Sequence, residues 1–135
     1  DYAHTPDGLD KLLYSIMMLE KKKINLVFGC GGERDIEKRT MMGNIADSYC
    51  EKIYITNDNP RSEDPLAIFQ RIKNGIKASK TFFIEDRGEA IKKSIADLQK
   101  NEILIIAGKG HENFQIVSEE KYIFSDIEAV KKCLK

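Results

Sequence analysis

The sequence contains no tryptophan, no long hydrophobic run and no excess of either charge, and it has only three prolines and three cysteines. A membrane-spanning helix needs roughly 20 consecutive apolar residues, and no stretch approaches that length. We also expect no signal peptide, which would have a charged start and an apolar middle. Lysine plus arginine and aspartate plus glutamate number 22 each, so no overall field favours nucleic acid. We therefore expect a cytoplasmic protein without membrane or nucleic-acid partners.

The cysteines and histidines argue against two further classes of site. An odd number of cysteines, Cys30, Cys50 and Cys133, does not form a closed disulfide set. His4 and His111 are far apart and lack a neighbouring ligand pattern, so no metal site is predicted. Cys30 lies in a glycine loop without a histidine near it in sequence, and a catalytic thiol is not expected there.

The 135 residues suit one domain with its own core, since 41% of them are hydrophobic. Apolar residues alternate between helical spacing and short buried runs, which favours an α/β fold with a mostly parallel sheet. The predicted strands span 24–29, 52–57, 81–85 and 103–107, and the predicted helices span 6–23, 38–50, 65–75, 87–100 and a segment after Ser125. A hairpin of 114–117 with 121–124 is expected at an antiparallel edge of the sheet. The helical spacing predicts that Leu19, Leu66, Leu98 and Leu134 face inward.

Three of the predicted strands are followed by clusters of glycines and charged residues. The clusters are Gly29–Asp35, Asp58–Arg61 and Gly108–Glu112. In parallel α/β sheets, ligands bind beyond the carboxyl ends of the strands, so these clusters are expected to converge at one sheet edge.

The cluster Asp58-Asn59-Pro60-Arg61 is typical of an amino-acid receptor site. The guanidinium of Arg61 is able to hold a carboxylate through two parallel hydrogen bonds, and Asn59 offers both a donor and an acceptor. Pro60 stiffens the turn between them. The alternative is a surface turn, in which Asp, Asn and Pro are common residues.

The other two clusters supply complementary charges. Glycines 29, 31 and 32 allow the close backbone approach that brings Arg34 into the crevice; they do not complete a dinucleotide fingerprint. Glu112 is suited to accept hydrogen bonds from a ligand ammonium. Exposed, solvated loops remain the alternative for both clusters. Asp1 and His4 precede a capped helix, where they are suited to bond free backbone donors. The alternative for Asp1 is a contact with ribose hydroxyls.

Taken together, these motifs resemble the C-terminal domain of the Mur ligases, and most closely the branch that adds the third amino acid of the peptidoglycan stem. The resemblance covers nearly the whole chain and rests on Asp1–Pro6, Phe28–Asp35 with Lys38-Arg39, Asp58–Pro65, Gly108–Glu112 and Phe124–Asp126. Thr40 stands where the family usually has proline.

The resemblance implies a Rossmann-like, three-layer domain that closes an ATP-dependent amide ligase. Residues 1–135 would be its amino-acid-binding domain, and the N-terminal and central ATPase domains would lie upstream, because no Gly-x-x-x-x-Gly-Lys-Ser/Thr loop occurs here. The substrates implied are meso-diaminopimelate, UDP-MurNAc-L-Ala-D-Glu and ATP with Mg²⁺, in a monomeric enzyme that makes peptidoglycan.

The resemblance also implies the binding residues, carried over motif by motif. They are Arg34, Asp58, Asn59, Pro60, Arg61, Gly108 and Glu112 for the amino acid and Asp1 for ATP, with no catalytic residue in this domain. Alternatives are a ligase for L-lysine or meso-lanthionine, a non-catalytic amino-acid-binding module, or a fragment of a nucleotide-dependent dehydrogenase. The isolated domain is expected to be inactive.

Overall fold

The computed structural model describes residues 3–32, 35–110 and 112–134. Its centre is a parallel sheet with strand order β3-β2-β1-β4. The strands are β1 (Lys23–Phe28), β2 (Cys50–Ile55), β3 (Lys80–Phe83) and β4 (Glu102–Ile106). Because β1 lies between β2 and β4 and is covered on both faces, all of its residues after Lys23 are buried.

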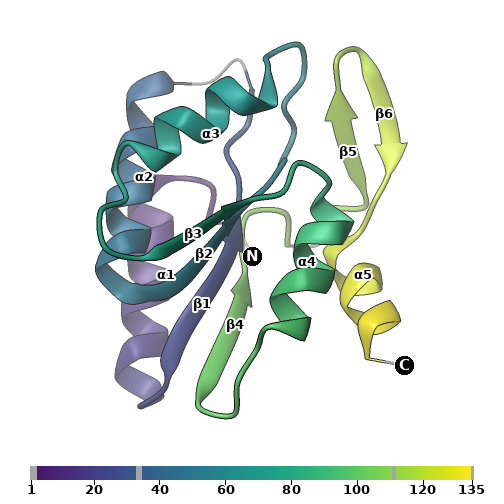
Figure 1. Ribbon diagram of the computed structural model, residues 1–135. Helices are drawn as coiled ribbons and strands as arrows, with labels where there is room; N and C mark the ends of the chain where they lie inside the picture. The colour runs from purple at the N-terminus through teal and green to yellow at the C-terminus, as the bar shows by residue number, and fades with distance from the viewer. Residues whose placement is uncertain (1–2, 33–34, 111, 135) are drawn as a thin grey trace.

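Helices cover both faces of the sheet and make three layers (Figure 1). On one face lie α1 (Pro6–Leu19), α2 (Ile36–Tyr49) and α3 (Pro65–Lys73), and on the other lie α4 (Arg87–Ala96) and α5 (Asp126–Cys133). Each face has its own hydrophobic core. The α/β, Rossmann-like fold predicted from the sequence is confirmed.

Several helix starts occur where capping residues predict them. The Thr5 hydroxyl accepts a hydrogen bond from the Gly8 amide at 3.1 Å, and Pro6 occupies the first helical position of α1. The side chain of Asp64 accepts from the Leu66 amide at 3.1 Å before α3. Ser125 caps α5, as its spacing to Glu128 indicates.

Four leucines predicted to face inward are instead exposed. Leu19 is 79% exposed, Leu134 71%, Leu66 47% and Leu98 36%. Leu19 and Leu134 lie at helix ends, beyond the layer that covers the sheet, and Leu98 follows the last residue of α4. At these three positions the helical spacing continues beyond the part of the helix that packs against another layer. The prediction that the four leucines face inward was wrong.

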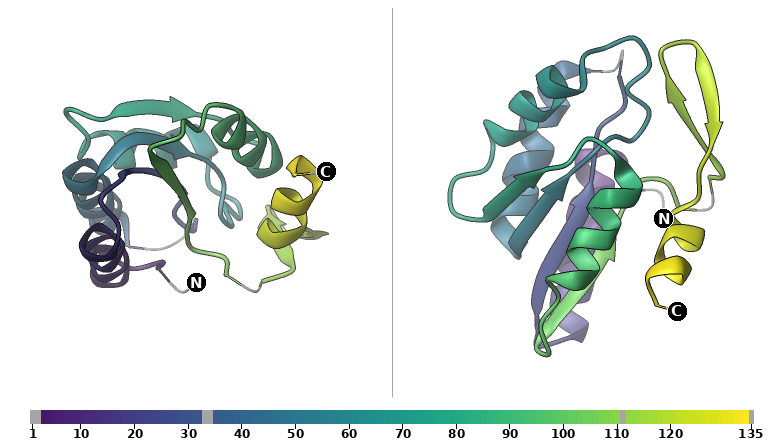
Figure 2. Two further views of the ribbon diagram at one scale, coloured as in Figure 1. Left: turned by 90° about the horizontal axis from the view of Figure 1, so that it is seen from below. Right: turned by 45° about the vertical axis from the view of Figure 1, so that its right-hand side comes forward.

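The predicted hairpin forms, but as a separate two-stranded sheet rather than as an edge of the main one. It consists of β5 (Phe114–Val117) and β6 (Glu120–Ile123), paired antiparallel. Figure 2 shows it standing beyond the end of the parallel sheet. The amide of Arg61 donates to the Ile116 carbonyl at 3.1 Å, and a parallel bridge joins Arg61 to Val117. The hairpin therefore packs along the loop that follows β2.

None of the helices in the described ranges has the length and apolar character needed to cross a membrane.

Asp47 holds the loop between α3 and β3 and should contribute to the loss of stability at acid pH. Its carboxylate accepts hydrogen bonds from the amides of Ser79 at 2.7 Å and of Lys77 and Ala78 at 3.1 Å. Burial alone would raise the pKa of Asp47, but these hydrogen bonds together lower it below its ordinary value. A lowered folded-state pKa stabilises the fold above the unfolded-state pKa of about 3.9, and the contribution disappears as the pH falls through the folded-state pKa.

Asp47→Asn should therefore lower the free energy of unfolding at pH 7 by about 1 kcal/mol. Between about pH 5 and about pH 2, the variant should also lose less stability than the unsubstituted protein. Urea unfolding of the unsubstituted protein and of the Asp47→Asn variant across this pH range measures the difference. Parallel curves of unfolding free energy against pH for the two proteins would contradict the role given to Asp47.

Candidate functional site

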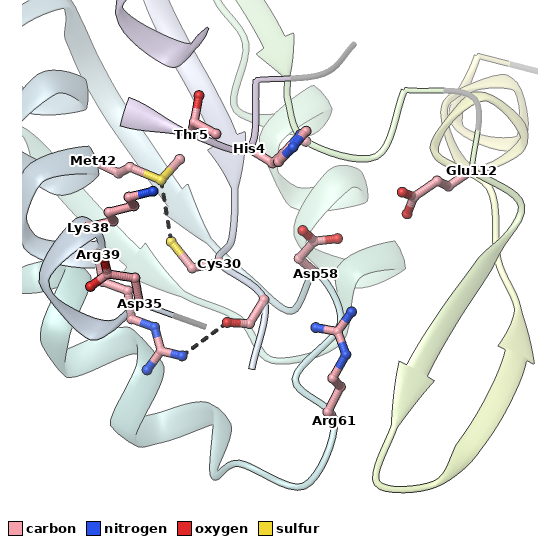
Figure 3. Close-up of a pocket in the computed structure, with 12 residues that line it drawn as sticks. His4, Thr5, Cys30, Asp35, Lys38, Arg39, Met42, Asp58, Arg61 and Glu112 are labelled. Atoms are coloured by element: carbon pink, nitrogen blue, oxygen red, sulfur yellow. Dashed lines mark hydrogen bonds between the residues drawn. The ribbon is translucent and has the colours of Figure 1, made fainter. Parts of the chain in front are cut away.

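A cavity of about 380 Å³ opens at the carboxyl ends of the central strands. Its walls come from the loops after β1, β2 and β4, together with the start of α1 and the first turns of α2. Figure 3 shows the side chains that reach into it. The convergence of the three sequence clusters on one sheet edge is therefore observed.

Four of the predicted binding residues line this cavity, namely Asp58, Arg61, Gly108 and Glu112. Asn59 and Pro60, which lie between Asp58 and Arg61 in the chain, are buried and are not among the side chains that line the cavity. Arg34 and Asp1 lie outside the described residues.

Gly32 brings the loop after β1 against the loop after β2. Its amide donates to the Asn59 carbonyl at 2.7 Å, and a Cβ at this position would overlap the carbonyl oxygen of Pro60. Only glycine permits this approach. The close backbone approach expected of this loop is observed, but Arg34, which it was predicted to bring into the crevice, lies outside the described residues.

The side chain of Arg61 lines the cavity, and its own backbone is in a strained conformation. Its φ of 54° lies in the left-handed region, which costs a residue with a side chain roughly 1–2 kcal/mol. The backbone is held there by its hydrogen bonds with the hairpin. Nη1 donates to the carbonyls of Gly32 at 3.1 Å and Asn59 at 3.3 Å, so the guanidinium is fixed while its other nitrogens have no hydrogen bond to a described residue.

Glu112 brings a carboxylate to the same cavity. The turn before it starts at Gly108, whose φ of 112° suits glycine, and the Glu112 amide closes the turn by donating to the Lys109 carbonyl at 2.9 Å. Its side chain is 42% exposed. Figure 3 shows Glu112 and Arg61 directed toward the space beside Asp58, so the cavity offers groups of both signs to a ligand.

Two buried cations support the site, and sequence reasoning did not assign either of them a role in it. Arg39 on α2 donates from Nη2 to Glu63 at 2.8 Å and to the Gly31 carbonyl at 3.0 Å. The hydrogen bond with Glu63 raises the pKa of Arg39, so it stays charged. Lys109, whose exposure is 1%, lies behind Asp58. The sequence places Lys109 between two glycines, but that pattern indicates a turn and not a buried charge.

Cys30 is a structural residue of the cavity wall. Burial is the main cause that raises its pKa to about 12, which leaves almost no thiolate at neutral pH. Its Sγ lies 3.7 Å from Sδ of Met42 (Figure 3). Within the described part of the chain, no group of three His, Cys, Asp or Glu side chains is placed to hold a metal ion.

These features define a Rossmann-like domain with a small polar cavity, of mixed charge, at the carboxyl ends of its parallel strands. A ligand that carries both a carboxylate and an ammonium group fits such a cavity.

The chain belongs to the Mur ligase family: the family model described as "Mur ligase, glutamate ligase domain" matches residues 1–110. It is 52% identical, over 95% of its length, to the UDP-N-acetylmuramoyl-L-alanyl-D-glutamate--2,6-diaminopimelate ligase of Rickettsia bellii, of which it covers 27%. The protein of the same name from Prochlorococcus marinus subsp. pastoris is 50% identical over 99% of this chain and is covered to 26%.

A solved structure of a UDP-N-acetylmuramoyl-L-alanyl-D-glutamate--2,6-diaminopimelate ligase is similar along the whole fold. It superposes with a TM-score of 0.92 at 40% identity, over 99% of this chain and 28% of that one. The chain thus spans about a quarter of the length of these relatives. The family resemblance inferred from the motifs is confirmed.

Proposed function

We propose that residues 1–135 are the C-terminal, amino-acid-binding domain of an ATP-dependent ligase that adds meso-diaminopimelate to UDP-MurNAc-L-Ala-D-Glu in the cytoplasm. The observation that carries this proposal is the match of the chain, nearly end to end, with relatives named as that ligase. The mixed charge of the cavity supports it, because diaminopimelate has a carboxylate and an ammonium group at each end.

In this proposal each polar group has a separate task. Arg61 binds a carboxylate of the amino acid with the nitrogens that its backbone contacts leave available, and Asn59 assists it. Glu112 accepts hydrogen bonds from the ammonium group of the same end. Gly108 allows the ligand to approach the backbone closely. Asp58 and Pro60 shape the wall, and Arg34 extends the cationic side.

The domain's contribution to the reaction is orientation. The UDP-linked peptide would be activated as an acyl phosphate by ATP and Mg²⁺, held mainly by a central domain, with Asp1 facing the nucleotide from this side. The residues of this chain would then hold the amino acid so that its reacting amine faces the carbonyl carbon of the acyl phosphate. Positioning of this kind supplies several kcal/mol toward the barrier.

Three alternatives are separated by their ligands. In this proposal Arg61 binds the end of diaminopimelate away from the reacting amine. L-lysine has no carboxylate at that end, so it leaves Arg61 without its partner, whereas meso-lanthionine keeps a carboxylate at both ends. A non-catalytic module would bind the amino acid in a protein without ligase activity. A dehydrogenase fragment would bind NAD, but the glycine loop after β1 packs against the backbone of Pro60, which is an argument against a dinucleotide there.

Ligation assays on the full-length, monomeric protein, with the three amino acids side by side, test the proposal. We expect the highest kcat/KM with meso-diaminopimelate, a lower value with meso-lanthionine, and a value at least about 100-fold lower with L-lysine, since a site built for a polar group discriminates strongly against its absence. The isolated 135-residue chain should hydrolyse no ATP and bind the amino acid weakly. A preference for L-lysine, or no ligation at all, would contradict the proposal.

A further inference from the structure

Lys109 is a buried charged side chain that the binding roles above do not use. It is 1% exposed, and its Nζ lies 3.0 Å from Asn59 Oδ1 and 3.0 Å from the Phe114 carbonyl. It also forms ion pairs with Asp58 at 3.2 Å and Glu112 at 3.4 Å. A fully buried lysine is rare and is retained where its charge is paired. All four partners lie in the motifs around the cavity or in the hairpin behind it.

The first consequence concerns the side-chain amide of Asn59. Its Oδ1 accepts hydrogen bonds from Lys109 and, at 2.9 Å, from the Ile116 amide. An amide oxygen has two lone pairs, and both are used here. The two donors therefore fix the orientation of the amide, and its NH₂ has no hydrogen bond to a described residue. An NH₂ group donates hydrogen bonds, so it suits a carboxylate and not an ammonium group.

The second consequence concerns Asp58 and Arg61. Both side chains line the cavity (Figure 3), and Arg61 has no ion pair with a described residue. Lys109 lies 3.2 Å from Asp58 and balances the charge of that carboxylate, which weakens its attraction for the Arg61 guanidinium. The guanidinium of Arg61 thus stays available to the ligand.

We propose that Lys109 is the positioning residue of the amino-acid site: it orients the Asn59 amide and neutralises Asp58, so that Asn59 and Arg61 both present donors to one carboxylate of the ligand. Lys109 itself does not touch the ligand. This inference rests on the proposed function and names the residue that gives the cavity its preference for a carboxylate.

The test is steady-state kinetics on the full-length ligase with Lys109→Met, which keeps the length of the side chain and removes its charge. We expect KM for meso-diaminopimelate to rise at least about tenfold. KM for ATP should stay within about twofold of the value for the unsubstituted enzyme, which is a rough allowance for assay scatter. Adding Asp58→Asn removes the uncompensated carboxylate, so the double variant should recover part of the loss but not all of it, since Asn59 still lacks its donor.

The control is Lys52→Met. Lys52 pairs with Glu102 at 3.4 Å at the opposite ends of the strands, so its loss should lower stability without changing KM for meso-diaminopimelate. An unchanged KM in Lys109→Met would overturn the inference, and if that variant does not fold, an unchanged KM in the double variant would do so. No ligation by the unsubstituted enzyme would refute the proposed function instead.

Discussion

Replacing Arg61 with alanine in the full-length ligase should raise KM for meso-diaminopimelate by roughly 30- to 1000-fold, which corresponds to about 2–4 kcal/mol of lost charge-assisted hydrogen bonding. The effect is large because the guanidinium is held in place by the Gly32 and Asn59 carbonyls before the ligand arrives. KM for ATP should stay the same. Kinetics with the other two substrates saturating measures the change.

Two further variants separate the side chain from the backbone. Alanine meets the same left-handed demand as arginine at φ 54°, so Arg61→Ala reports the loss of the side chain alone. Arg61→Gly relieves the strain, and its unfolding free energy should remain within about 1 kcal/mol of the parent despite the lost contacts. Arg61→Lys keeps the charge without the planar fork and should restore only part of the affinity. A KM unchanged in Arg61→Ala would remove Arg61 from the site.

The largest expected effect on stability belongs to Arg87, the first residue of α4. It is buried and forms two hydrogen bonds with Asp126, at 2.7 and 2.8 Å. It also donates to the carbonyls of Asn57 and Ala107, both at 3.1 Å. Those carbonyls lie where two of the cavity loops begin, so Arg87 joins these loops to α5. Arg87→Met should lower the free energy of unfolding by about 3–5 kcal/mol, because it leaves Asp126 buried without a counter-charge.

Denaturant unfolding of the 135-residue chain measures this loss. The double variant Arg87→Met with Asp126→Leu removes both charges and should be more stable than the single variant. Arg71→Met, on the exposed part of α3, is the matched control and should change stability by less than about 0.5 kcal/mol. A single variant as stable as this control would show that the buried pair has no structural role.

The sequence predicted the order of the elements and the convergence of the loops because both depend on local signals. Capping residues such as Thr5 and Asp64 accept hydrogen bonds from amides two or three positions along the chain. Parallel strands bring their carboxyl ends to one edge of the sheet. Helix ends were less predictable. Leu98 continues the helical spacing of α4, but burial depends on a partner layer that the spacing does not reveal.

The buried cations could not be predicted from a single sequence. Lys109 and Arg87 are charged residues, which in most positions are solvated, and each has a partner that is distant in the chain. Lys109 and Asn59 are 50 positions apart, and Arg87 and Asp126 are 39 apart. The separation of the hairpin from the main sheet is likewise set by its packing along the loop after β2. Only the fold brings these groups together.

A crystal structure of the full-length protein with meso-diaminopimelate tests the central claim most directly. The account predicts one carboxylate of the ligand within hydrogen-bond distance of Arg61 and of the Asn59 NH₂ group, with the neighbouring ammonium group at Glu112. Diaminopimelate bound at another place, or bound in this cavity with its ammonium group at Asn59, would contradict it.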